Sequence, residues 1–200
     1  MTPISRIWPV LTLAAFIGTA PELALAHAQG HEGESGFWAG FTHPMLGWDH
    51  VAAMVAVGLW GAFLGAPAIW LLPVIFPLVM AFGALIGILG FSLPLVEAGI
   101  ALSGVVLGLM ILLKAKPALW MAATLVGLFA IFHGFAHGAE LPSSAHAYAF
   151  IIGFVIATGL LHMAGIAFGA LTRWPAGTLA VQSTGAVIAG VGTVFLFNLV

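Results

Sequence analysis

Six long apolar stretches, separated by short polar or proline-containing breaks, constrain this chain more than any other feature. Hydrophobic residues make up 62% of the 200 and charged residues only 5%, whereas about a quarter of the residues in a soluble domain are charged. Each stretch is close to the length of about 20 residues that an α-helix needs to cross a bilayer. We therefore predict an all-α polytopic membrane protein with spans at Pro44–Leu64, Ala68–Phe91, Pro94–Leu113, Ala118–Leu141, His146–Leu171 and Gly177–Leu199.

The N-terminus has the pattern of a cleavable signal peptide. Arg6 precedes an apolar run, Ile7–Ala20, that is too short to span the bilayer, and Ala24–Ala26 has small residues at a typical cleavage site. We predict a signal peptide at 1–26, a short external polar segment at 27–43 and a six-helix transmembrane domain at 44–200. The alternative is an uncleaved extra helix interrupted by prolines.

Prolines mark several predicted helix boundaries. Pro44 and Pro94 stand at the starts of spans, where a missing backbone N–H costs nothing. Pro73 and Pro77 lie inside the second span, where we expect a kink or a broken helix.

The few charges predict an orientation. If the mature N-terminus is external, Lys114, Lys116 and Arg173 all fall in cytoplasmic loops, as the positive-inside rule requires. Both ends of the mature chain are then external. Tryptophans support this topology, with Trp60, Trp70, Trp120 and Trp174 predicted near the inner interface and Trp38 and Trp48 near the outer one.

Ionisable side chains gather at the predicted outer ends of the spans. By the helix rise, His50 and His133 both lie about 9 to 10 Å below the outer boundary, and Glu97 about 5 Å below it. Ionisable groups inside a membrane are costly and usually mark a functional site. The candidate metal ligands are His43, Asp49, His50, Glu97, His133, His137 and Glu140.

Two segments carry most of these groups. In His133–Glu140 the ligands stand at i, i+4 and i+7, which places them on one helix face. His43, His50 and Met54 form a similar stripe on the first span, where Asp49 either binds from the side or orients an imidazole. Four glycine pairs are predicted to be helix-packing surfaces, and such faces also suit a homo-oligomer: Gly61/Gly65, Gly83/Gly87, Gly104/Gly108 and Gly165/Gly169.

Composition excludes several functions. There is no cysteine, so any metal must be held by imidazole, carboxylate, thioether or backbone oxygen. No basic stripe suggests nucleic acid, and no phosphate-binding loop or soluble domain suggests ATP hydrolysis. His146 and His162 are interpreted as structural, with His162 a weaker candidate for an exit-side contact. The tail with His27 and His31 is interpreted as an unstructured segment, and the alternative is that it collects metal outside.

The segments His43–His50 (HPMLGWDH) and Phe132–Glu140 (FHGFAHGAE) closely resemble the two signature segments of the HupE/UreJ family of membrane nickel and cobalt permeases. The resemblance extends over the mature chain. It implies a secondary transporter, not an enzyme, in the bacterial inner membrane. The implied substrate is divalent nickel or cobalt, and no bound cofactor is implied. All the candidate metal ligands except Glu97 lie in the two motifs, so the resemblance implies that they handle the metal.

Two other hypotheses remain open at the level of sequence. A His-x-x-x-His pair and an Asp-His pair could hold a catalytic zinc, giving an intramembrane hydrolase that cleaves a lipid amide. A passive sensor or scaffold would use the same cluster without any flux of metal.

Overall fold

The computed structural model describes residues 36–139 and 147–199, which form seven α-helices and one short 3-10 helix, without strands. This confirms the all-α class for the described part of the chain. All these elements belong to one unit, Glu34–Val200. The elements are α2 (Phe37–Leu46), α3 (Trp48–Leu64), α4 (Ala68–Ile88), α5 (Val96–Leu112), α6 (Leu119–Ala139), α7 (Ala147–Gly169), η3 (Ala170–Arg173) and α8 (Pro175–Asn198).

Four segments are long and apolar enough to cross a membrane: Ala68–Ile88, Leu119–Ala139, Tyr148–Arg173 and Pro175–Asn198. The bent pair α2 and α3 passes the same test when taken together, which makes up to five spans among the described residues. The 17 residues of α5 are apolar but shorter. The chain is therefore a multi-pass membrane protein, while the sixth span stays a prediction.

The first predicted span is not one helix. The helix starts at Phe37 instead of Pro44, ends at Leu46 and continues as α3 at an angle of 83°. Gly47 lies at the break in an extended conformation, with φ −83° and ψ 111°. A Cβ at Gly47 would lie within 3 Å of the side chains of Asp49 and His50, so glycine permits the polar groups to approach the bend.

The prolines also differ from expectation. Pro44 lies inside α2, close to its C-terminal end, and not at the start of a helix. Pro73 and Pro77 lie inside α4, which is one continuous helix, so the helix is not broken there, and a kink stays a prediction. Proline removes only its own hydrogen bond to the preceding turn, and neighbouring helices compensate for that loss in membrane proteins.

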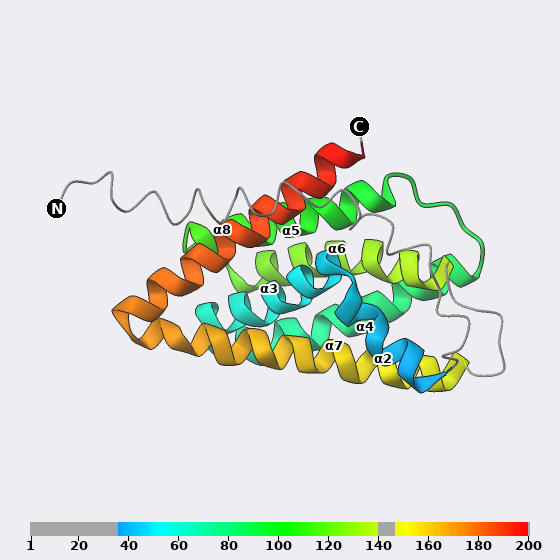
Figure 1. Ribbon diagram of the computed structural model, residues 1–200, viewed down its shortest axis with the longest axis horizontal. Helices are drawn as coiled ribbons and strands as arrows, with labels where there is room; N and C mark the ends of the chain where they lie inside the picture. Colours follow the sequence, from blue (N-terminus) through cyan, green and yellow to red (C-terminus); the bar gives the residue numbers. More distant parts are fainter. Residues whose placement is uncertain (1–35, 140–146, 200) are drawn as a thin grey trace. The chain divides into compact units, whose positions relative to one another are not determined.

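The helices pack in pairs through small residues (Figure 1): α4 with α6, α5 with α8, and α7 with both α2 and α3. Three predicted glycine pairs lie in these contacts: Gly83/Gly87 against α6, Gly104/Gly108 against α8 and Gly165/Gly169 against α3. In the fourth pair, Gly61 packs against Ala68, whereas Gly65 ends α3 at φ 83°. Close backbone approach is how membrane helices gain packing energy without a hydrophobic driving force.

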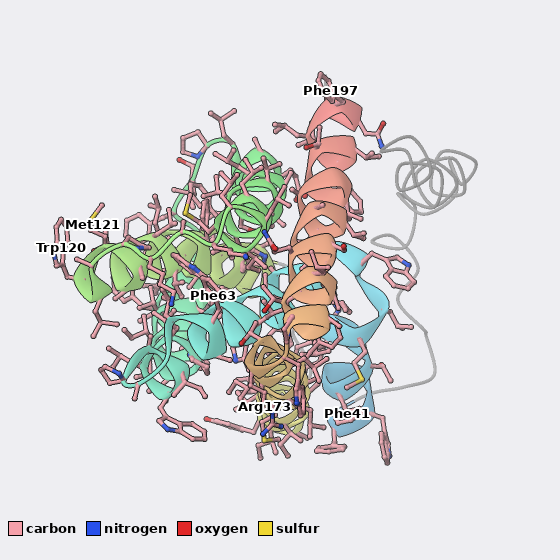
Figure 2. The ribbon with its side chains drawn as sticks, turned by 90° about the vertical axis from the view of Figure 1, so that its left-hand side faces the viewer. Phe41, Phe63, Trp120, Met121, Arg173 and Phe197 are labelled. Atoms are coloured by element: carbon pink, nitrogen blue, oxygen red, sulfur yellow. The ribbon has the colours of Figure 1, made fainter. Side chains whose placement is uncertain are left out.

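The interior of the bundle is built around α3. Met54, Val57, Leu59 and Trp60 of this helix are fully buried. The Trp60 indole N–H donates to the Ala115 carbonyl at 3.2 Å, so this side chain packs inside the bundle beside the loop that carries Lys114 and Lys116. Trp120 instead points away from the bundle, as expected for a side chain facing lipid or the interface (Figure 2).

Some predictions fall outside the described residues. They are the signal peptide at 1–26, the polar tail with His27 and His31, and the residues Glu140 and His146.

The close contact at Gly108 gives a test of the packing. A Cβ there would meet the backbone of Ala189 and Gly185 on α8, whereas Gly190 has open space around it. We expect Gly108→Ala to destabilise the protein by about 1–3 kcal/mol through overpacking, and Gly190→Ala to be neutral or stabilising by up to about 1 kcal/mol. The apparent Tm of each purified variant, measured at one scan rate, checks this. Equal Tm values for the two variants would contradict the packing.

Candidate metal site

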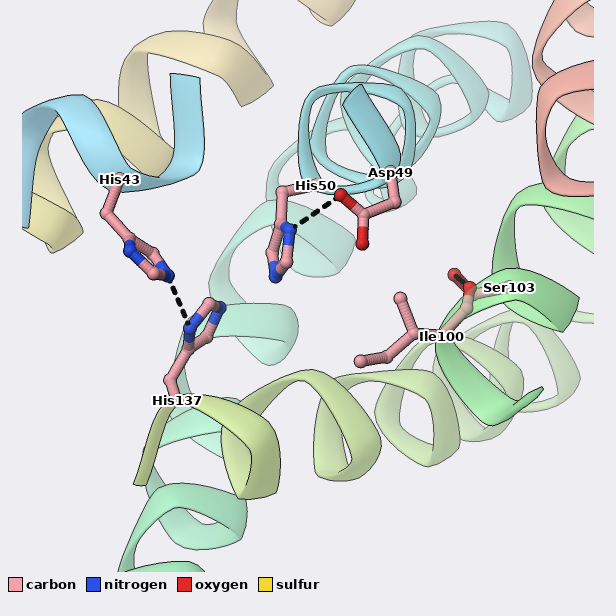
Figure 3. Close-up of polar contacts among 6 residues, drawn as sticks. All are labelled: His43, Asp49, His50, Ile100, Ser103 and His137. Atoms are coloured by element: carbon pink, nitrogen blue, oxygen red, sulfur yellow. Dashed lines mark hydrogen bonds and ion pairs between the residues drawn. The ribbon is translucent and has the colours of Figure 1, made fainter. Parts of the chain in front are cut away.

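Four imidazoles from three helices lie together beside the bend at Gly47. We call His43, His50, His133 and His137 the histidine cluster. His50 is central: its ring centroid lies 4.6 Å from that of His137, 5.5 Å from that of His133 and 6.1 Å from that of His43. The ring centroids of His43 and His137 are 5.0 Å apart. Figure 3 shows the rings of His43, His50 and His137 converging from α2, α3 and α6.

The bend and the helix period place these rings. His133 and His137 are four residues apart on α6, so they share one helix face, as predicted; both are buried, and both rings contact His50 of α3. His43 reaches the cluster by a different route from the one we predicted. It does not share a straight helix with His50, because the turn at Gly47 carries α2 away and lets His43 approach His137 instead.

Asp49 contacts His50 directly. Its carboxylate oxygen Oδ1 lies 2.9 Å from Nδ1 of His50, and both side chains are buried, with 8% and 5% of their surface exposed. When Nδ1–H of His50 donates to this carboxylate, the ring is held in one orientation and its lone pair is on Nε2. Of the two predicted roles for Asp49, the geometry matches the acceptor that orients an imidazole.

His133 has the same arrangement with a backbone partner. Its Nδ1–H donates to the Phe129 carbonyl at 2.9 Å, which fixes the ring and puts the lone pair on Nε2. His133 is fully buried, and among the described residues its Nε2 has no hydrogen-bond partner. A buried ring nitrogen without a hydrogen-bond partner lowers the stability of the folded protein by about 1–3 kcal/mol unless a ligand binds it.

His43 and His137 approach each other at the spacing of two ligands on one ion. Nε2 of His43 and Nδ1 of His137 are 3.2 Å apart. Two nitrogens bound at about 2.1 Å to one metal ion, at angles between square and tetrahedral, lie about 3.0–3.4 Å apart. The distance between these two nitrogens therefore matches that of two ligands on a shared cation.

Phenylalanines that the sequence did not single out enclose the cluster. Phe154 of α7 lies 4.5 Å from the His137 ring, Phe150 lies 5.9 Å from His43, and Phe76 of α4 lies 5.6 Å from His133. They keep water from the rings, which strengthens electrostatic interactions inside the site. The chain has 15 phenylalanines, so none of them stands out by residue type alone.

Among the described residues, the predicted carboxylate Glu97 does not join the cluster. Glu97 is exposed in the first turn of α5 and makes no hydrogen bond or ion pair in the described part of the chain. Glu140 lies outside the described residues. Within residues 36–139 and 147–199, no group of three or more His, Asp or Glu residues is arranged to hold a metal ion as it stands. Coordination by the cluster therefore remains a proposal.

Comparison with known proteins agrees with the two motifs. The chain is 42% identical over 185 residues to Protein HupE of Rhizobium leguminosarum bv. viciae, an alignment that covers 92% of this chain and 95% of that protein. No solved structure matches it. Residues 14–195 match the family described as HupE / UreJ protein, and the chain belongs to this family.

Proposed function

We propose that this protein is a secondary transporter that admits divalent nickel, or cobalt, through the histidine cluster. The observation that carries the proposal is the convergence of four imidazoles from α2, α3 and α6 in a largely buried space. Members of the HupE/UreJ family generally transport nickel or cobalt, which supports it. The hydrolase alternative gains no support from the family match.

The donor set suits a transition-metal cation. Imidazole nitrogen binds nickel, cobalt, zinc and copper well, whereas magnesium and calcium prefer oxygen ligands. Asp49 adds a buried negative charge beside His50, which offsets part of the cost of bringing a divalent ion out of water. We expect Glu140 and Glu97 to act in the same way during entry, as the motifs and the predicted depth suggest.

The ends of α3 support an inward direction. His50 lies in its first turn, whereas Phe63 near its C-terminal end contacts Lys116 at 4.9 Å from the ring centroid. Gly169, next to η3 with Arg173, packs against Ala62 of the same end. The basic residues thus lie at the end of α3 opposite to the cluster. By the positive-inside rule this basic end is cytoplasmic and the cluster faces outward.

The remaining features of the topology belong to the same proposal. A cleaved signal at 1–26, six spans, and external ends of the mature chain place the protein in the inner membrane with the cluster at the external side. In this arrangement the apolar α5 is the third span, although its helix has only 17 residues.

Transport into proteoliposomes tests the proposal. We expect saturable entry of nickel or cobalt in the wild-type protein, reduced at least about 100-fold in His50→Ala and in His137→Ala, since each removes a ring from the cluster. Zinc provides a third cation for comparison. Thr184→Val is the matched control and should transport normally, because the Thr184 hydroxyl donates to the Ala180 carbonyl within α8. Tight binding of nickel and cobalt without any flux would contradict the permease and favour a sensor or scaffold.

Asp49 provides a second test. Asp49→Asn keeps the shape and a hydrogen-bonding group beside His50 but removes the charge. We expect nickel affinity to fall about 10- to 100-fold, as for other groups that orient a metal-binding histidine. Equilibrium binding to the purified protein measures this, with Thr42→Val as a control because the Thr42 hydroxyl bonds only to backbone carbonyls of its own helix. Unchanged affinity in Asp49→Asn would show that Asp49 does not serve the cluster.

A further inference from the structure

His162 of α7 is a buried imidazole outside the histidine cluster. Only 2% of its surface is exposed, and among the described residues its Nε2 is enclosed without a hydrogen-bond partner. Nearly all buried polar groups in proteins have a partner, and the exceptions require an explanation. A packing role alone does not explain why this nitrogen is left without one.

Thr158 shows the same feature one helical turn earlier. It is 1% exposed, and its hydroxyl has no hydrogen-bond partner in the described part of the chain. The hydroxyls of two other helical threonines do have a partner within their own helix: Thr184 and Thr193 each donate to the carbonyl four residues earlier. Residues 158 and 162 stand at i and i+4, so two unsatisfied polar groups share one face of α7.

This face of α7 leads to the histidine cluster. Phe150 and Phe154 precede Thr158 at the same four-residue spacing, and both contact the His43 ring. Phe154 also contacts His137. Two helical turns, about 12 Å, separate Phe154 from His162 along α7. One continuous face therefore runs from the cluster to His162.

Helices α4 and α3 also connect the histidine cluster with His162. Phe76 of α4 contacts both histidines, with its ring centroid 5.6 Å from that of His133 and 5.6 Å from that of His162. On α3, the buried residues His50, Met54 and Gly58 follow at four-residue spacing, and Gly58 lies against the backbone of His162. A single aromatic ring thus lies between His133 of the cluster and His162.

We propose that His162 and Thr158 form an inner station for the transported cation, deeper in the protein than the histidine cluster. The ligands are the imidazole Nε2 and the threonine hydroxyl, with waters retained by the ion. This inference rests on the proposed transport function. Neither α4 nor α7 carries an acidic residue, so the station offers neutral ligands and binds the cation more weakly than the cluster. Weak binding suits an inner position, because an ion must leave such a site to be conducted.

Separate measurements of binding and flux test this proposal. The variants are His162→Leu and Thr158→Val, with His162→Gln and Thr158→Ser as conservative versions that keep a polar group. Thr193→Val is the control, since its hydroxyl already bonds within its own helix. Nickel or cobalt affinity is measured by equilibrium binding to the purified protein, and the maximal rate of entry is measured in proteoliposomes.

We expect His162→Leu and Thr158→Val to keep the affinity of the outer cluster within about twofold while lowering the maximal rate about tenfold, the change typical of losing a supporting metal-site group. Thr158→Ser and His162→Gln should recover part of the rate, and Thr193→Val all of it. A purely structural role would lower the yield or stability of folded protein without this separation of rate from affinity.

Wild-type flux in both His162→Leu and Thr158→Val would overturn the inner station. If His162→Leu does not fold, Thr158→Val decides: a full rate overturns the proposal, and a reduced rate with normal affinity supports it. A wild-type protein that carries no cation is a different result, because it overturns the proposed function and the inner station with it.

Discussion

The turn at Gly47 is the constraint on which the candidate site depends. Because the chain bends by 83° there, α2 packs against α7 and delivers His43 to His137 on α6, while α3 begins with Asp49 and His50 beside the same space. A straight helix from Pro44 to Leu64 would carry His43 along the axis of α3 instead. The absence of a side chain at Gly47 also leaves the space that Asp49 and His50 occupy. The position of Gly47 therefore both separates α2 from α3 and admits the polar groups, which brings imidazoles from three helices together.

At the site, a backbone carbonyl or a carboxylate accepts a hydrogen bond from one ring nitrogen of a histidine. The other ring nitrogen then faces the interior. Asp49 does this for His50, and the Phe129 carbonyl does it for His133. Aromatic rings from α4 and α7 enclose the imidazoles. Such an enclosure makes each charge interaction stronger, but it also makes an unfilled site costly. The proposed transport of a cation that binds the rings and then moves on is consistent with both effects.

Much of the fold could be predicted from the sequence, because long apolar stretches in lipid must satisfy their own backbone as helices. The shared face of His133 and His137 could also be predicted, because the helix period determines it, whereas the sequence left the role of Asp49 open between two alternatives. The bend could not, since glycine and proline are common inside membrane helices and do not by themselves indicate a break. The burial of Trp60 inside the bundle could not be predicted either, because its hydrogen-bond partner, the Ala115 carbonyl, is far away in the sequence. The nearness of His162 to Phe76 depends on how α4 and α7 pack, which the rise along one helix does not reveal.

X-ray absorption spectroscopy of the nickel-loaded protein tests the central claim most directly, because it counts imidazole ligands on the metal. The measurement is made with His27→Ala and His31→Ala in place, so that the N-terminal tail contributes no imidazole. Joint coordination by the histidine cluster predicts at least two imidazoles per nickel, and one fewer when His43→Ala is added. Nickel bound only by oxygen ligands, or a spectrum unchanged by His43→Ala, would contradict coordination across the bend at Gly47.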